Sequence, residues 1–110
     1  MNSITKYGIP ESDLDALLSE LKKNSEINEI ILFGSRAKGT FRNGSDIDIA
    51  LKGRNLKLND ILDAISVVDK LLLPYKLDLV IYTRIKEPDL TEHINRVGII
   101  LFKRQNPAGG

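Results

Sequence analysis

The sequence contains no cysteine and no tryptophan, and only one of its 110 residues is a histidine. Without cysteine the chain has no disulfide, no thiolate zinc site and no cysteine nucleophile. The formal net charge of +1 argues against an extended nucleic-acid-binding surface, although Arg36, Lys38 and Arg42 form a local basic cluster. No apolar run approaches the roughly 18 residues of a membrane span, and the first residues show no signal-peptide pattern. These absences predict a cytoplasmic protein that makes no membrane contact.

The composition is that of a globular protein, with 42% hydrophobic and 28% charged residues. We expect one domain over residues 1–104 and a flexible tail over residues 105–110, which holds two glycines, a proline and no apolar anchor beyond Ala108. A domain of this size has room for one core but not for a second lobe. A site that needs two lobes would therefore take one wall from a partner.

Hydrophobic periodicity predicts three helices. After Pro10, Ser12 and Asp15 resemble a capping box, and leucines then recur at helical spacing up to about residue 24. A second helix is expected over residues 59–73, ended by Pro74. A short third helix is expected after Pro88, with Gly98 as its stop. In the second helix we expect six apolar residues to face the core: Leu58, Ile61, Leu62, Ile65, Val68 and Leu72.

Four strands are predicted over residues 27–33, 46–51, 76–82 and 99–102. The turn pair Asn43-Gly44 joins the first two strands and favours an antiparallel pairing. The element order therefore predicts an α/β (α+β) fold, a mixed sheet of about four strands flanked by helices.

Two aspartates lie at alternate positions of the second strand. Asp46 and Asp48 therefore project from one face, with Cα atoms roughly 6.5–7 Å apart, while Ile47, Ile49 and Leu51 form the apolar opposite face. Two such carboxylates repel each other in a half-buried setting. A divalent cation between them would relieve the repulsion, and carboxylate oxygens are hard ligands suited to Mg²⁺. The alternative is a solvated strand face.

A third aspartate, Asp78, interrupts the apolar strand from Leu77 to Ile81. A carboxylate in such a strand is costly unless it is paired or ligated. If this strand lies beside the strand of Asp46 and Asp48, three carboxylates converge, which is enough for one or two metal ions. The alternative for Asp78 is a structural ion pair, for example with Arg36.

A possible phosphate-binding loop follows the first strand directly. Gly34 and Ser35 would expose backbone N–H groups and a hydroxyl, with Arg36 and Lys38 adding positive charge. Phosphate donors followed by metal-binding carboxylates are the two halves of a magnesium–nucleotide site. Each half alone is a weak signal, whereas their joint order is rare. For His93, the only histidine, the pattern favours a core or surface role over a catalytic one.

The segment Gly34-Ser35-Arg36-Ala37-Lys38-Gly39, followed by Ser45-Asp46-Ile47-Asp48-Ile49, resembles the defining motif of the DNA polymerase β-like nucleotidyltransferases, most closely their minimal (MNT) branch. Leu77-Asp78-Leu79-Val80 resembles the strand that bears the third carboxylate. The resemblance implies the polymerase β-like nucleotidyltransferase fold, with Mg²⁺ (one or two ions) and ATP as substrate. It implies metal ligands and catalytic residues at Asp46, Asp48 and Asp78, the last helping to activate the attacking hydroxyl. It implies nucleotide-binding residues at Gly34, Ser35, Arg36, Lys38 and Ser45.

Minimal members of that family resemble antitoxins that act on a small helical HEPN-type toxin. The resemblance therefore implies a Mg-dependent transfer of AMP from ATP to a hydroxyl of such a partner protein. The alternative is a non-catalytic antitoxin or binding subunit that neutralises its partner by occlusion. The three aspartates favour the enzyme, because a pure binder has no need of them. A second domain that would read the base and the acceptor has no counterpart in the sequence.

Overall fold

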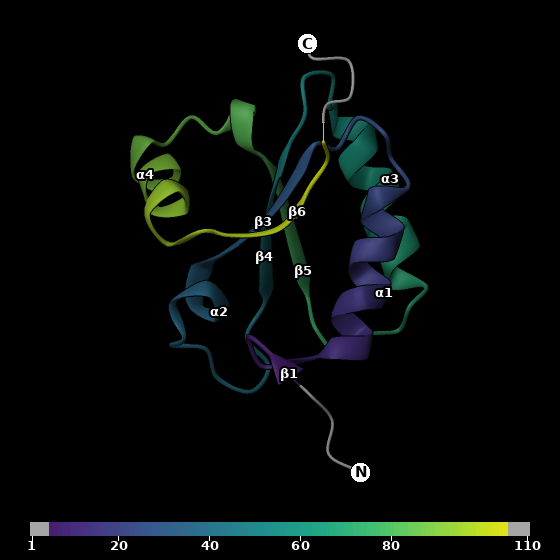
Figure 1. Ribbon diagram of the computed structural model, residues 1–110, viewed down its shortest axis with the longest axis vertical. Coiled ribbons are helices and arrows are strands. Elements are labelled where there is room, and N and C mark those ends of the chain that lie inside the picture. The colour runs from purple at the N-terminus through teal and green to yellow at the C-terminus, as the bar shows by residue number, and fades with distance from the viewer. Residues whose placement is uncertain (1–4, 106–110) are drawn as a thin grey trace.

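A mixed four-stranded sheet forms the centre of the computed structural model, which describes residues 5–105 (Figure 1). The elements in chain order are β1 (Thr5–Lys6), β2 (Ile9–Pro10), α1 (Glu11–Lys22), β3 (Glu29–Phe33), α2 (Gly34–Lys38), β4 (Ile47–Lys52), α3 (Leu58–Asp69), β5 (Leu77–Ile81), the 3₁₀ turn η1 (Tyr82–Arg84), α4 (Pro88–Val97) and β6 (Ile99–Lys103). The strand order is β5-β4-β3-β6. Strand β3 is antiparallel to β4 and β6, whereas β4 and β5 are parallel. The mixed sheet and its flanking helices confirm the predicted fold class.

Helices cover both faces of the sheet, with α1 and α3 side by side on one face and α2 and α4 on the other (Figure 1). Alternating strand residues supply the two cores. The larger core contains Ile30, Leu32, Ile49 and the leucines of α1. The smaller core lies under α4 and consists of Ile31, Phe33, Ala50 and Ile94.

The capping box predicted for the first helix is not formed. Helix α1 begins at Glu11 with Pro10 at its N-cap, and within the described residues no side chain caps this end. Ser12 lies inside the first turn rather than before it. Proline fixes the φ angle of the residue that precedes the first turn, so the chain enters the helix there without a hydroxyl cap. The boundary near Pro10 was predicted correctly, but the mechanism was not.

The predicted apolar face of α3 was wrong in three positions. Leu58, Leu62 and Leu72 are 61%, 54% and 87% exposed, whereas Ile61 and Val68 are buried. The helix ends at Asp69, and Leu72 follows in a left-handed turn with φ 54°, so it no longer lies on the helical stripe. Leu58 and Leu62 lie one helical turn apart on the outward side, because only one side of α3 packs on the sheet and α1.

The remaining differences from the predicted elements are local. The pair β1–β2 and the five-residue helix α2 were not predicted, because both are shorter than the periodicity that a sequence pattern needs. Gly98 ends α4 as expected, but with extended backbone instead of a left-handed cap. No helix among residues 5–105 is long and apolar enough to cross a membrane. The predicted tail lies, beyond Gln105, outside the described residues.

Candidate active site

The three segments with predicted chemistry meet at one end of the sheet. Strand β3 ends at Phe33, where Gly34 and Ser35 begin α2. Because β4 runs antiparallel to β3, its first residues lie beside that end. Strand β5 runs parallel to β4 and begins at the same end. The topology therefore brings the glycine loop and the acidic strand starts together.

Strand register places Asp48 between the loop and Asp78. Asp48 is the partner of Phe33 on β3 and of Asp78 on β5. Residues opposite each other on neighbouring strands project from the same face of a sheet. Phe33 belongs to the core under α4, so Asp48 and Asp78 face the α4 side as well. The carboxylates of Asp48 and Asp78 thus share one face, which was expected only on the condition that their strands are neighbours.

Electrostatics couple all three aspartates through Asp48. Burial raises the pKa of Asp48 above its ordinary value, and the negative charges of Asp78 and Asp46 raise it further. Arg36 acts on this pKa in the opposite direction but does not outweigh these effects. Asp46, just before β4, and Asp78 are both exposed. Burial and both neighbouring carboxylates therefore disfavour the negative charge of one half-buried carboxylate, Asp48.

The side chains do not form a closed metal cage. Over residues 5–105, no group of three His, Asp or Glu side chains is arranged to hold one ion. The predicted convergence is therefore pairwise, through Asp48, rather than threefold. Magnesium usually takes one or two carboxylates and completes its octahedron with substrate phosphates and water. Asp48 with Asp46 or Asp78 fits a magnesium ion that binds together with a nucleotide.

Gly34 is fixed by its surroundings on two sides. Its φ angle is 75°, a left-handed conformation that favours glycine, and a β-carbon there would overlap the Oδ2 atom of Asp48. On the other side its backbone N–H donates to Nε2 of His93, on α4, at 3.1 Å. The glycine loop therefore touches both the central carboxylate and the helix that covers the site.

His93 is the residue at this site that the sequence interpretation missed. Its ring also packs edge-on against Phe33, with centroids 6.1 Å apart and an interplanar angle of 81°. The side chain is half-buried on α4. The contact joins residues that are 59 positions apart, so local patterns could not indicate it. A lone histidine three positions after Leu90 and beside Ile94 was the only available signal.

Arg36 was predicted to bind nucleotide, but its side chain is buried and donates to backbone carbonyls. It is only 3% exposed. Its Nε and Nη2 atoms donate to the carbonyl of Ser45 at 3.2 and 2.8 Å, and Nη1 donates to the carbonyl of Tyr7 at 2.9 Å. The guanidinium also lies about 5 Å from the ring centroids of Phe41 and Tyr75. These contacts assign Arg36 to holding the loop together rather than to binding phosphate.

The alternative of an ion pair between Asp78 and Arg36 is also not observed. Among the residues that the structure describes, the ion pairs are Lys23–Glu20 and Arg96–Glu92. Asp78 therefore has no structural ion-pair partner in this part of the chain, and its exposed carboxylate is available to a ligand.

The other predicted nucleotide-binding residues lie around the same loop. The Oγ atom of Ser45 accepts a hydrogen bond from the N–H of Arg42 at 2.8 Å and closes the Asn43-Gly44 turn. The carbonyl of Ser35 accepts from the N–H of Thr40 at 3.0 Å at the end of α2. Lys38 is exposed at the last position of that helix. Lys38 and the hydroxyl of Ser35 remain predicted ligands of the triphosphate.

Replacing Arg36 by lysine is expected to lower the free energy of unfolding by about 2–4 kcal/mol. Lysine cannot reproduce the two-point bond to Ser45, and the partly buried carbonyls of Ser45 and Tyr7 would lose donors. Urea unfolding measures the change. Arg42→Lys, in the exposed part of the same loop, is the matched control and should change stability by less than about 0.5 kcal/mol. Equal stability of Arg36→Lys and the wild type would contradict the structural role.

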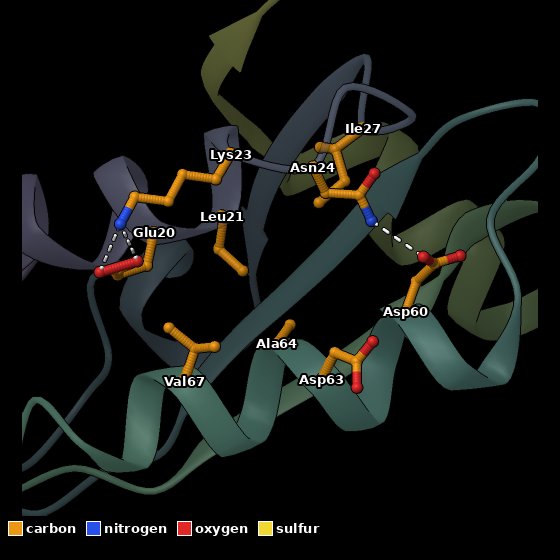
Figure 2. Close-up of a pocket in the computed structure, with 9 residues that line it drawn as sticks. All are labelled: Glu20, Leu21, Lys23, Asn24, Ile27, Asp60, Asp63, Ala64 and Val67. Carbon is orange, nitrogen blue, oxygen red and sulfur yellow. Dashed lines mark hydrogen bonds and ion pairs between the residues drawn. The ribbon is translucent and has the colours of Figure 1, made fainter.

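A cavity of about 260 Å³ lies away from this site, between α1 and α3 (Figure 2). Four of its polar residues form two pairs: Nζ of Lys23 lies 2.9 Å from Oε2 of Glu20, and the Asn24 amide donates to Asp60 at 3.0 Å. Leu21, Ile27, Ala64 and Val67 form the apolar part of its lining. Because α1 and α3 cover the face opposite to α4, this cavity does not contribute to the aspartate site.

A mixed sheet with a glycine loop after one strand and coupled carboxylates at the start of the next two defines a nucleotidyltransferase domain. The chain belongs to the polymerase β nucleotidyltransferase family, which it matches over residues 10–107. No curated protein matches the sequence.

Solved structures support the same fold. One is a toxin–antitoxin complex with AMP-PNP, 26% identical, covering 86% of this chain and 74% of that chain with a TM-score of 0.66. Another is the MNT antitoxin in complex with the tri-AMPylated HEPN toxin of Shewanella oneidensis, with 22% identity, coverage of 86% and 73% and a TM-score of 0.65. A third is a candidate minimal nucleotidyltransferase, with 23% identity, coverage of 89% and 98% and a TM-score of 0.63. The two likenesses below 25% identity show the fold alone.

Proposed function

We propose that this chain is a Mg-dependent adenylyltransferase that moves AMP from ATP to a hydroxyl of a partner protein of the HEPN toxin type and so acts as a cytoplasmic antitoxin. One observation carries the proposal: Asp48 lies in register with Asp78 and touches the backbone of Gly34. A carboxylate pair beside a glycine loop suits a bound magnesium–triphosphate.

The predicted site residues have separate roles in this proposal. Asp46 and Asp48 would hold magnesium, with Asp78 as a further ligand, and the ion would neutralise phosphate charge when it is bound. Gly34, Ser35 and Lys38 would bind the triphosphate. Ser45 and Arg36 would act through the loop, because their described contacts are to its backbone. A bound magnesium ion would offset the repulsion between Asp48 and its neighbouring carboxylates, and this favours the binding of magnesium at this site.

The reaction is an in-line displacement at phosphorus. The acceptor hydroxyl oxygen forms a bond to the α-phosphorus of ATP, and the bond from that phosphorus to the pyrophosphate oxygen breaks. The proton of the hydroxyl passes to the carboxylate of Asp78 and then to water. The products are an AMP ester of the acceptor and pyrophosphate. Asp78 suits this role because it is exposed and unpaired within the described residues, so an acceptor can reach it.

A relative that is 26% identical supports both the nucleotide and the partner. That structure is a toxin–antitoxin complex that contains AMP-PNP, an ATP analogue.

Occlusion without chemistry is the second candidate function. Leu58 and Leu62 lie on neighbouring turns of α3 and are more than half exposed. Adjacent exposed apolar side chains are typical of surfaces that bind other proteins. In that case the chain would neutralise its partner by contact alone. The two functions differ in whether the carboxylates are needed.

The test uses ATP labelled at the α-phosphate, purified partner protein and magnesium. Adenylyl transfer puts the α-label on the partner and releases unlabelled pyrophosphate, whereas γ-labelled ATP leaves the partner unlabelled. EDTA should abolish the labelling. Neutralisation of the partner with no α-label transferred would overturn the enzyme and favour occlusion. Absence of any Mg–ATP binding in calorimetry would overturn the nucleotide site itself.

A further inference from the structure

We propose that His93 is a positioning residue for the nucleotide loop: by accepting the N–H of Gly34 it fixes the start of α2 before nucleotide binds. This inference rests on the proposed function, because the loop is taken to bind the triphosphate of ATP. It adds to that function a residue that lies outside the glycine and aspartate motifs.

The hydrogen bond defines the state of the imidazole. Nε2 accepts the Gly34 N–H at 3.1 Å, so the ring carries its proton on Nδ1. Gly34 is the first residue after β3 and has a left-handed φ of 75°. Because it begins α2, its N–H group has no hydrogen-bond partner within that helix. The acceptor on α4 supplies that partner. The orientation of the Gly34 peptide is therefore set by a side chain from another element.

Packing holds the acceptor in place. Ile94, the next residue, is buried in the core under α4, and the His93 ring meets the edge of Phe33. Phe33 directly precedes Gly34, so the same side chain contacts two consecutive residues of the loop start. The imidazole thus has little freedom to turn away. A group held by packing can preorganise a loop more effectively than a mobile surface residue.

The position of Gly34 matters for both halves of the site. Its backbone approaches Asp48 so closely that a β-carbon there would overlap the Oδ2 atom of this side chain. A shift of the Gly34 peptide would therefore change the phosphate loop and its distance from the central carboxylate together. Without His93 the loop would sample other conformations and would have to be ordered when the nucleotide binds. The cost then falls on nucleotide affinity rather than on the chemical step.

Two matched variants separate the acceptor from the ring. In His93→Gln a side-chain oxygen can reach the place of Nε2, so the hydrogen bond is kept. In His93→Asn the side chain is one methylene shorter and the acceptor falls short of Gly34. We expect the Kd for Mg–AMP-PNP and the KM for ATP to rise roughly five- to tenfold in His93→Asn and in His93→Ala, the effect of one ordinary hydrogen bond. His93→Gln should stay within about twofold of the wild type, and kcat should change little in all three.

Calorimetry with Mg–AMP-PNP, steady-state kinetics and the ¹H–¹⁵N spectrum of the full chain test the proposal. The Gly34 amide hydrogen should exchange with solvent faster in His93→Asn than in the wild type, and in His93→Gln it should stay near the wild-type rate. Equal affinity of all variants for Mg–AMP-PNP would overturn the positioning role while leaving the nucleotide site intact. A loss in His93→Gln as large as in His93→Asn would overturn the role of the acceptor. Failure of the wild type to bind Mg–AMP-PNP would overturn the proposed function and this inference with it.

Discussion

Replacing Asp48 by asparagine is expected to abolish adenylyl transfer and to raise the melting temperature of the nucleotide-free protein at neutral pH. Asp48 is the residue through which the other two aspartates are coupled. Asparagine cannot supply the charge that a magnesium–triphosphate requires, so we expect a loss of on the order of 10³-fold or more in kcat/KM. The same change removes a half-buried negative charge that burial, Asp78 and Asp46 all disfavour. Function and stability should therefore move in opposite directions.

The stability effect has a definite pH dependence. The folded protein raises the pKa of Asp48 above its ordinary value of 3.8. The folded state therefore binds this proton more tightly than the unfolded state does, and ionisation of Asp48 destabilises the fold. Below about pH 3.8 the carboxyl is protonated in both states, so wild type and Asp48→Asn should melt alike. The advantage of the variant should appear as the pH rises through this value and be complete above the raised pKa.

Thermal melts followed by circular dichroism between pH 3 and pH 8 measure this difference, and α-labelled ATP measures transfer. Asp63→Asn is the matched control, because Asp63 is exposed on α3, over the opposite face of the sheet. It should change neither transfer nor the pH profile. Undiminished labelling by Asp48→Asn would remove this aspartate from catalysis. A lower melting temperature for Asp48→Asn at pH 7 would contradict the electrostatic description of the site.

Much of the aspartate site could be predicted because strand alternation is local. Period-two geometry alone predicted a shared face for Asp46 and Asp48, although Asp46 lies just before β4 in the structure. The Asn43-Gly44 turn indicated the antiparallel pairing that the structure confirms. The strand that pairs with the other edge of β4 could not be predicted in this way. Only the resemblance and an assumption about strand order placed Asp78 there, since a parallel partner can be any later strand.

Two of the contacts of the site that were missed join segments far apart in the sequence. Arg36 was predicted to face phosphate because it follows the glycine loop, but its partners include the carbonyl of Tyr7, in a hairpin turn too short to predict. His93 reaches Gly34 across 59 positions. In both cases the side chain's role depends on which segment lies opposite, and a one-dimensional pattern does not contain that information. The prediction that the leucines of α3 are buried was wrong for a related reason. Periodicity identifies the apolar face of a helix, but it does not say how much of that face the sheet covers.

Replacing Gly34 by alanine is expected to abolish binding of Mg–ATP and to destabilise the domain. Alanine at φ 75° costs roughly 1–2 kcal/mol in backbone strain. Its methyl group would also overlap Oδ2 of Asp48, so the carboxylate or the loop must shift, and we expect this shift to separate them. That separation breaks the contact on which the proposed site depends. We therefore expect the Kd for Mg–AMP-PNP to rise by at least about a hundredfold, beyond what strain alone produces.

Two other glycines of the same region make the strain and the overlap separable. Gly39 and Gly44 have φ angles of 83° and 84°, and among the described residues no atom lies within 4 Å of a β-carbon built on either. Gly39→Ala and Gly44→Ala should therefore share the loss of stability measured by urea unfolding but keep nucleotide affinity within a few-fold of the wild type. If all three variants lost affinity equally, backbone strain would explain the effect and the close approach of Gly34 to Asp48 would have no special role. If only Gly34→Ala loses binding, the nucleotide site depends on the close approach of Gly34 to the carboxylate of Asp48, which a β-carbon would prevent.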